Sequence, residues 1–332
     1  MTESIKRPVI WALLLPEAGF RSQVMGLAET LNALVDGIVI EKNVDLRAPW
    51  RYLPSTLCPL PRVGLTANSD RLVAPWPDLV IGCGRRTIPL ALAIKHLSSG
   101  ATKAVFIQNA KAAAPDFDLV FPMHHDGLQG PNVIAVDTAL HRVTPEKLER
   151  GRDHWRARFE GLKRPLIGVV LGGSTASLRF TEACARDLVS KLEHLARETG
   201  AGFAITPSRR TDENALAVMR DFALRQSDTW LWDGQHDNPY FGILGLSDAL
   251  IITEDSVSMV SEALVAGKPV ATVPLEGHAR RHKLFIDNLT AKGAITRFDG
   301  TLPPPSNVII PNATQHAADA VRDLLGIGPT VN

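Results

Sequence analysis

The sequence predicts an α/β protein of two tandem Rossmann-like domains that face a cleft. Short apolar runs alternate with polar or glycine-containing loops and with helical patterns, as in a parallel sheet covered by helices. This alternation restarts after about residue 145, and 332 residues are enough for two domains of ordinary size. Hydrophobic residues make up 45% of the chain and charged residues 21%, which is typical of a globular protein.

The first half, residues 1–144, begins with a strand, a helix and a second strand. Val9–Leu15 is a continuous apolar run, the pattern of a strand buried on both faces, and a helix is expected over 22–34. A long connection rich in proline and arginine spans 45–76. The turn after the first strand lacks GxGxxG, so the dinucleotide fingerprint is absent. Further strands are expected at 38–41, 79–81, 104–107, 119–121 and 132–135, and a helix ends near residue 97.

The second half, residues 145–310, repeats this plan, and 311–332 form a terminal helix expected to pack back on the first domain. Thr144 and Pro145 begin a highly charged helix that runs to Phe159, because threonine caps a helix and proline suits its first turn. We expect this helix on the surface, linking the two halves. The remaining strands are expected at 166–171, 202–206, 229–232, 249–253 and 270–273, and the remaining helices at about 181–199, 212–224, 256–266, 278–291 and 312–325.

Charge and cysteine content exclude several classes of function. The formal net charge is +1, which does not indicate a nucleic-acid partner. The three cysteines are far apart and form no CxxC, so we expect neither a disulfide framework nor a cysteine zinc site. This cysteine pattern favours a protein of the reducing cytoplasm. His124 and His125 lack a third ligand at a useful spacing, so no metal is expected. Basic residues around 47–62 and 278–283 predict a peripheral contact with the inner membrane.

The stretch 247–276 has the layout of a nucleotide site. A buried strand leads to Asp255 and Ser256, which are expected to cap the helix that Gly267 ends. A helix N-terminus carries partial positive charge and unpaired N–H groups that attract phosphate. Glu262 follows about two turns later, where its carboxylate can accept the hydroxyls of a ribose. The alternative is an ordinary capped unit with a solvated Glu262.

Other polar loops follow predicted strands, and parallel strands of one sheet end at the same edge. In the first half, one such group predicts an anion or acceptor site, with a tight turn and solvated arginines as the alternative. Its residues are Gly84, Arg85, Arg86 and Gln108. In the second half, the nucleotide site is predicted by three features: arginines that can bind a diphosphate, a cluster of hydroxyls, and a helix start. The alternative is that the arginines form salt bridges and that the loops are simple turns. The residues of this predicted site are Ser208, Arg209, Arg210, Asn238, Tyr240, Thr253, Ser258 and Met259, beside those of 247–276.

The second half resembles the donor-nucleotide half of GT-B glycosyltransferases, in particular the N-acetylglucosaminyltransferase of peptidoglycan synthesis. The likeness is carried by the stretch 247–276 and by the glycine turn after the strand 166–171. In that group a glycine turn meets the diphosphate and a helix glutamate binds the ribose. The resemblance therefore implies that Gly172, Gly173 and Ser174 contact phosphate and that Glu262 binds ribose.

Nearly the whole chain also resembles the bacterial branch of the elongated-mitochondria family, the mitochondrial fission factors. The matching segments are IGCGRRTIPLAL (Ile81–Leu92), FDLVFPMHHDGLQGPNVI (Phe117–Ile134), TPSRRT (Thr206–Thr211) and DNPYFGILGLSDALIITEDSVSMVSEALVAGKPV (Asp237–Val270). This resemblance implies a GT-B-like fold and a sugar-nucleotide enzyme. The family's first loop usually reads GxxGHxxQ, whereas Phe20 takes the histidine position here.

Because the loop histidine is missing, the catalytic base stays open between Glu17, His125 and Asp126. The first hypothesis is a GT-B glycosyltransferase that moves a sugar from a nucleotide-diphospho sugar to an envelope or lipid-linked glycan. The nucleotide-sugar is its substrate, and no cofactor is expected. Two alternatives remain: a sugar-nucleotide 2-epimerase, which shares the fold, and a non-enzymatic scaffold that recruits a partner.

Overall fold

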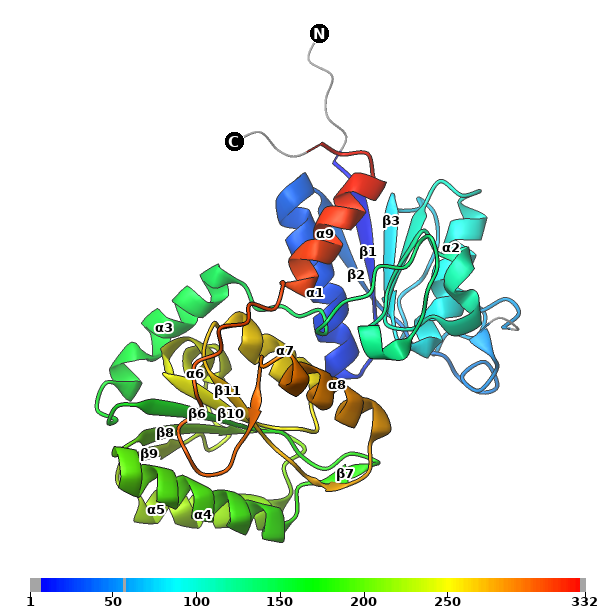
Figure 1. The fold of residues 1–332 in the computed structure, drawn as a ribbon. Coiled ribbons are helices and arrows are strands. Elements are labelled where there is room, and N and C mark those ends of the chain that lie inside the picture. The colour runs from blue at the N-terminus through cyan, green and yellow to red at the C-terminus, as the bar shows by residue number, and fades with distance from the viewer. Residues whose placement is uncertain (1–6, 56–57, 329–332) are drawn as a thin grey trace. The chain divides into compact units, whose positions relative to one another are not determined.

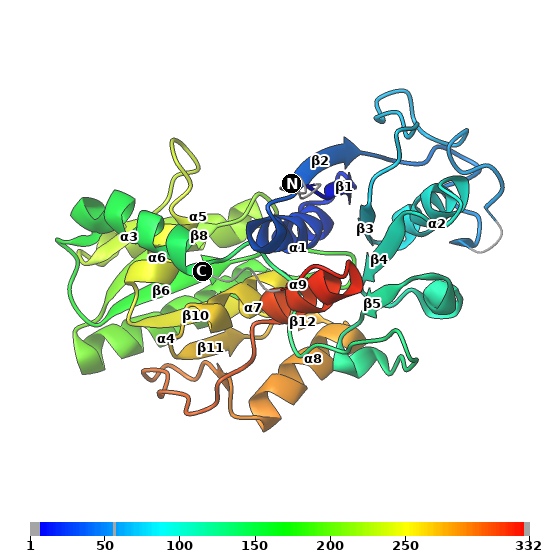
Figure 2. The same ribbon diagram turned by 90° about the horizontal axis from the view of Figure 1, so that it is seen from above.

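The computed structural model describes residues 7–55 and 58–328, which form two compact units. One unit holds the chain up to Arg142 together with the residues from Pro311 on, and the other holds Val143–Ile310. Each unit is a parallel sheet with helices on both faces (Figures 1 and 2). In the part of the chain so described, no helix combines the length and apolar character needed to cross a bilayer.

The first unit has a five-stranded parallel sheet in the order β2-β1-β3-β4-β5. Leucine, isoleucine and valine from alternate positions of β1 pack on opposite faces of this sheet, because successive side chains of a strand point to opposite sides. Helices α1 and α9 cover one face, and α2 with the connection 45–76 covers the other. The elements are β1 (Val9–Leu14), α1 (Ala18–Val35), β2 (Ile38–Asn43), β3 (Leu79–Cys83), α2 (Ile88–Leu97), β4 (Lys103–Ile107), β5 (Leu119–Phe121) and α9 (Ala313–Leu324).

The expected strand at 132–135 is wrong, because this segment makes a single isolated bridge to β5, and a second bridge lies just beyond both segments. Val133 pairs with Val120 and Val136 pairs with Met123, both in parallel. The N–H of Ile134 donates to the carbonyl of Val120, and the N–H of Val136 donates to that of Pro122. The bond that would join the two bridges needs an N–H from Pro122, and proline has none. The ladder is therefore interrupted.

The second unit has a six-stranded parallel sheet in the order β13-β11-β10-β6-β8-β9. Helices α4 and α5 bury one face of the sheet, and α6 packs on the other face beside Gly168. The elements are α3 (Pro145–Phe159), β6 (Leu166–Leu171), β7 (Leu178–Arg179), α4 (Glu182–Thr199), β8 (Gly202–Pro207), α5 (Glu213–Arg225), β9 (Thr229–Leu231), α6 (Tyr240–Leu246), β10 (Ala249–Thr253), α7 (Val257–Val265), β11 (Val270–Val273), β12 (Glu276–Gly277), α8 (Arg280–Ala291) and β13 (Thr296–Arg297).

Local capping signals locate most of the helix starts. The side chains of Thr144, Thr181, Asp212 and Asn312 each accept a backbone N–H of the helix that follows. The charged helix α3 is only partly a surface element, because Gly151 lies against the main chain of Phe241 in α6. The pairing of β7 with β12 and the strand β13 are absent from the sequence prediction, since two residues carry no readable period.

Helix α9 returns the end of the chain to the first unit. It lies beside α1 in both views of the ribbon (Figures 1 and 2), and the two helices pack against each other. The hydroxyl of Thr314 accepts the N–H of His141 at 2.9 Å and donates to the carbonyl of the same residue at 3.2 Å. Ala317 and Val321 are completely buried, so this helix is part of the core of the first unit.

Candidate functional site

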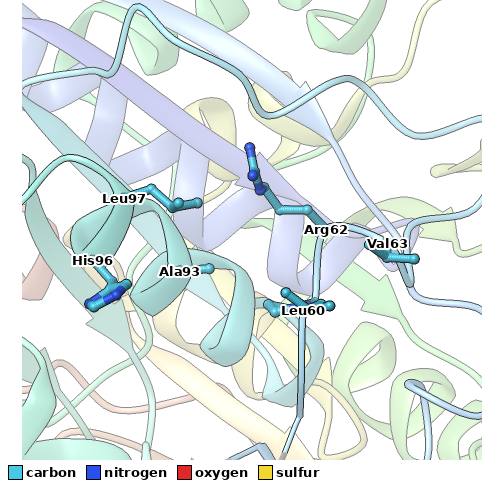
Figure 3. A pocket seen from close by; sticks show the side chains of 7 residues that line it. Leu60, Arg62, Val63, Ala93, His96 and Leu97 are labelled. Atoms are coloured by element: carbon cyan, nitrogen blue, oxygen red, sulfur yellow. The ribbon is translucent and has the colours of Figure 1, made fainter.

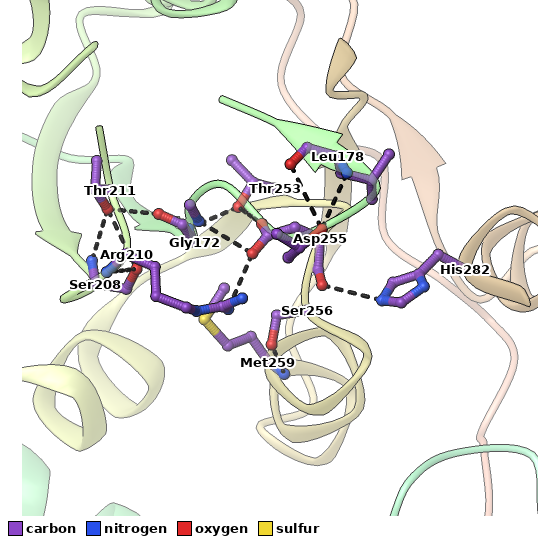
Figure 4. Close-up of polar contacts among 12 residues, drawn as sticks. Gly172, Leu178, Ser208, Arg210, Thr211, Thr253, Asp255, Ser256, Met259 and His282 are labelled. Atoms are coloured by element: carbon purple, nitrogen blue, oxygen red, sulfur yellow. Dashed lines mark hydrogen bonds and ion pairs between the residues drawn. The ribbon is translucent and has the colours of Figure 1, made fainter. Parts of the chain in front are cut away.

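Three loops of the second unit meet at the carboxyl edge of its sheet. Strand β6 pairs with β10 on one side and with β8 on the other, all in parallel, so the loops that follow these strands are neighbours. They bring together the glycine turn after β6, Ser208–Thr211 after β8 and Asp255–Met259 after β10 (Figure 4). These are the loops from which the sequence predicts the nucleotide site.

The carboxylate of Asp255 lies at the centre of this cluster, and its side chain is fully buried. It accepts the hydroxyl of Thr253 at 2.7 Å, the N–H of Gly173 at 3.0 Å and the guanidinium of Arg210 at 3.1 Å. The expectation that Asp255 caps α7 is wrong, because its oxygens point to the glycine turn. Ser256 is the cap, and its hydroxyl accepts the N–H of Met259 at 3.3 Å.

The glycine turn is closely packed, and its N–H groups have acceptors within the protein. The N–H of Gly172 donates to the Thr253 hydroxyl at 2.7 Å, and that of Ser174 donates to the Arg210 carbonyl at 3.1 Å. A Cβ at Gly172 would lie 2.1 Å from a carboxylate oxygen of Asp255, and one at Gly173 would lie 1.9 Å from the Arg210 carbonyl. Glycine is therefore required at both positions, and a phosphate at this turn would compete with these protein acceptors.

The loop after β8 presents two exposed arginines. Its main chain is held by Thr211, whose hydroxyl donates to the Gly172 carbonyl and accepts the N–H of Ser208 at 2.9 Å. Arg209 is exposed, and the side chain of Arg210 is 49% exposed although it contacts Asp255. Positive charge therefore lies at the surface of this loop, next to the buried carboxylate.

Glu262 is buried, so the alternative of a solvated carboxylate is wrong. Only 9% of its surface is exposed, and the hydroxyl of Tyr240 donates a hydrogen bond to it. Burial, followed by the charge of Glu262, raises the pKa of Tyr240 well above its ordinary value. The side chain of Asn238 accepts the N–H of Tyr240 at 2.9 Å and so shapes the start of α6. Ser258 is half-buried on α7.

The structure adds a histidine that the sequence analysis did not single out. The Nε2 atom of His282 lies 3.1 Å from the main-chain oxygen of Asp255 (Figure 4). His282 belongs to α8, and no local pattern in that basic helix indicates a partner 27 residues away. Taken over residues 7–55 and 58–328, histidine, cysteine, aspartate and glutamate form no group of three that could hold a metal ion.

In the first unit, the two arginines expected to bind an anion have protein partners. The guanidinium of Arg86 contacts the carboxylates of Glu17 and, at 2.6 Å, of Asp45, and only 10% of this side chain is exposed. Arg85 donates to the carbonyls of Leu53 at 2.9 Å and Arg51 at 2.7 Å. Arg86 therefore holds Glu17 in place at the start of α1.

The other residues of that predicted anion site have main-chain roles. Gly84 has a φ of 83°, and a Cβ there would meet the side chains of Leu15 and Phe20. Gln108 also has a φ of 83°, and its N–H donates to the Phe121 carbonyl at 2.8 Å. The tight-turn interpretation describes the geometry of these two positions.

The three candidate bases are not neighbours in the sheet. Glu17 follows β1, whereas His125 and Asp126 follow β5 in a short 3₁₀ turn, His124–Asp126. Strands β3 and β4 separate β1 from β5, and three interstrand steps amount to about 14 Å. The carboxylate of Asp126 accepts the N–H of Met123 at 3.3 Å. Glu17 and the His125–Asp126 pair are therefore alternatives and do not form one catalytic group.

Comparison with solved structures identifies the fold. The UDP-GlcNAc 2-epimerase of Methanocaldococcus jannaschii aligns over 95% of this chain and 99% of its own, with a TM-score of 0.59 and 10% identity. A second structure of that enzyme, in complex with UDP-GlcNAc and UDP, also aligns over 95% of this chain and 99% of its own, with a TM-score of 0.54 and 10% identity. MurG of Acinetobacter baumannii aligns over 96% of this chain and 100% of its own, with a TM-score of 0.55 and 15% identity. The chain thus has the fold of two Rossmann-like domains found in GT-B glycosyltransferases and these epimerases.

Comparison with curated proteins identifies a relative and a family. The chain is 29% identical over 271 residues to the mitochondrial fission protein ELM1 of Arabidopsis thaliana. This alignment covers 74% of the chain and 63% of the plant protein. The family model described as Mitochondrial fission ELM1 matches residues 18–325. The chain therefore belongs to the mitochondrial fission ELM1 family.

Proposed function

We propose that the second unit binds a nucleoside-diphosphate sugar and that the protein transfers the sugar to an envelope or lipid-linked glycan. The observation that carries this proposal is the exposed pair Arg209 and Arg210 at the carboxyl edge of the sheet, where Arg210 contacts Asp255 just ahead of the N-terminus of α7. A guanidinium binds phosphate oxygens in pairs, and a helix N-terminus favours negative charge. The M. jannaschii structure solved with UDP-GlcNAc and UDP, which has the same fold, supports this choice of ligand.

Each part of the site has a role in this proposal. Arg209, Arg210 and the start of α7 stabilise the diphosphate as it leaves the anomeric carbon, because fixed donors reduce the cost of developing charge. Ribose hydroxyls share the carboxylate of Glu262 with Tyr240, since a carboxylate has about four acceptor positions. The glycine turn serves mainly to position Asp255, because its N–H groups already have protein acceptors.

The first unit holds the acceptor in this proposal, and the protein acts in the cytoplasm at the inner membrane. Among the candidate bases, we assign the deprotonation of the acceptor hydroxyl to Glu17. Its carboxylate follows β1 at the carboxyl edge of the first sheet, is half exposed, and is held by the buried Arg86. A general base must keep its orientation while remaining accessible to the proton it removes.

Binding is tested by calorimetric titration and thermal shift with UDP-GlcNAc, UDP, GDP, CDP and CMP. A ligand that binds only the folded state raises the unfolding midpoint. We expect a diphosphate ligand to bind and the Arg209→Ala/Arg210→Ala double variant to lose roughly 100-fold or more in affinity, at about 1.5 kcal/mol or more per charge-assisted bond. Arg225→Ala is the matched control, because Arg225 is an exposed arginine of the same unit that pairs with Glu193. Absence of binding, or equal loss in the control, would overturn the donor-site proposal.

A non-enzymatic scaffold is the second candidate, and a specific observation favours it. The N–H groups of the glycine turn are bound internally, and Phe20 stands where the family's first loop usually has histidine. Release of UDP from UDP-GlcNAc in the presence of an envelope lipid extract separates the two candidates. Sugar transfer that Glu17→Gln abolishes supports the transferase, whereas nucleotide binding without turnover supports the scaffold. Inversion of UDP-GlcNAc at C2 without an acceptor, followed by NMR, would instead identify an epimerase.

A further inference from the structure

The first unit has an apolar pocket that the proposed function does not use. It lies between the turn 60–63 and the end of α2, and its volume is about 370 Å³ (Figure 3). Apart from Arg62 and His96, the side chains that line it are apolar. These are Leu60, Pro61, Val63, Ala93 and Leu97.

The apolar side chains at this pocket are exposed. Leu60 is 75% exposed, Val63 55% and Leu97 42%. Leu60 also has a φ of 43°, in the left-handed region that an L-residue adopts only against steric repulsion from its Cβ. A strained backbone that presents a large apolar side chain to solvent is a reason to look for a function.

Arg62 lines this pocket, and the guanidinium groups of Arg62, Arg47 and Arg85 contact main-chain oxygens or indole rings. Arg47 donates to the Val63 carbonyl at 3.2 Å, beside the pocket. These contacts orient the guanidinium groups but do not neutralise them, because a carbonyl oxygen or an indole ring carries no negative charge. The remaining contacts are Arg47 over Trp50, Arg62 with the Leu72 carbonyl and over Trp76, and Arg85 with the carbonyls of Leu53 and Arg51.

The connection 45–76 carries more net positive charge than the whole protein. The connection 45–76 holds four arginines and two acids, Asp45 and Asp70, which gives +4 − 2 = +2, against +1 for the whole chain, and Asp45 contacts Arg86 outside this connection. Asp70 accepts the main-chain N–H of Asn43 at 2.6 Å, at the end of β2. Arg51 and Arg71 are exposed.

We propose that this surface, defined by Leu60, Val63, Leu97 and the arginines of 47–71, docks on an anionic lipid bilayer. Exposed apolar side chains insert at the boundary between headgroups and acyl chains, and arginines around them are attracted to anionic headgroups. A protein partner would also cover an apolar patch, but the uncompensated positive charge favours a surface of many negative groups. The proposal concerns the first unit alone and does not depend on nucleotide binding in the second.

Flotation of the full-length protein with lipid vesicles tests the proposal. We expect binding to vesicles that contain phosphatidylglycerol, little binding to pure phosphatidylcholine, and release as salt is raised, since salt screens the attraction. Each arginine near an anionic surface contributes about 1 kcal/mol, or roughly a fivefold factor in affinity. Arg51→Gln/Arg71→Gln therefore lowers affinity by about 25-fold, and Leu60→Asp/Val63→Asp abolishes binding.

Leu224→Asp is the matched control, because Leu224 is 84% exposed on α5 of the second unit. All variants change exposed side chains, and an unchanged unfolding midpoint verifies that they fold. Lack of binding to phosphatidylglycerol vesicles, or equal loss in Leu224→Asp, would overturn the proposal. Displacement from the vesicles by inorganic phosphate at low concentration would likewise overturn it, since that identifies a site for free phosphate.

Discussion

Replacement of Asp255 by asparagine tests whether the buried carboxylate organises the three loops around it. The side chain is fully buried and accepts bonds from Thr253, Gly173 and Arg210. Asparagine keeps the size of the side chain but replaces one acceptor oxygen by an NH₂ group, which only donates. If the amide oxygen keeps the bond to Thr253, the NH₂ group faces the N–H of Gly173 and the guanidinium of Arg210, and both of those bonds are lost.

The contacts give the size of the effect. A hydrogen bond to a charged group contributes about 1.5–3 kcal/mol, so Asp255→Asn should cost about 2–3 kcal/mol. Asp255→Ala leaves the N–H of Gly173 and the hydroxyl of Thr253 without this acceptor, and each buried donor left unsatisfied costs about 1–3 kcal/mol, so the variant should cost about 2–6 kcal/mol. Arg210→Ala should cost about 1 kcal/mol at most, because that side chain is 49% exposed and solvent screens the pair.

Scanning calorimetry of the full chain measures these costs. For a unit of the size of Val143–Ile310, 1 kcal/mol shifts the midpoint by about 2–4 °C, so Asp255→Asn should lower it by roughly 4–12 °C. The order of stability should be the parent protein, Arg210→Ala, Asp255→Asn and Asp255→Ala. An asparagine variant as stable as the parent protein would refute the reasoning, and so would an Arg210→Ala variant as unstable as Asp255→Ala.

Three further predictions follow from packing and from pKa. Gly173→Ala should lower the free energy of unfolding in urea by about 1–3 kcal/mol, because the added Cβ meets main-chain atoms. Gly161→Ala is the control and should hardly change this free energy, because the space around Gly161 is open. Equal losses in the two variants would contradict the prediction. The raised pKa of Tyr240 beside Glu262 contributes stability that is complete below about pH 10, the pKa of an unfolded tyrosine, and is lost as pH rises toward the folded pKa. Tyr240→Phe should remove that loss in unfolding curves, and an unchanged pH profile would argue against it. Burial raises the pKa of the Cys83 thiol, so thiol reagents should not modify it in the native protein. Mass spectrometry should detect modification of Cys83 only after urea is added, and rapid labelling of the native protein would contradict this.

The sequence allowed much of the fold to be predicted, because its signals act over a few residues. Strand β10 at Ala249–Thr253 and helix α3 at Pro145–Phe159 have the predicted bounds. The cap at Ser256 is a contact across three residues, from its own hydroxyl to the N–H of Met259. A buried run, a cap and a stop are local, so each can be recognised without knowledge of the neighbouring strands.

The tertiary structure decided what the candidate residues contact. Asp255 has the composition of a cap, yet it bonds to Gly173, 82 residues away, because β6 and β10 are adjacent in the sheet. Arg86 has the pattern of an anion ligand, yet it holds Glu17, 69 residues away. The sequence by itself determined where strands end and which polar groups gather at those ends. Only the register and order of the strands decided which of these groups neutralise one another, since side-chain pairing acts over a few ångströms in space and not along the chain.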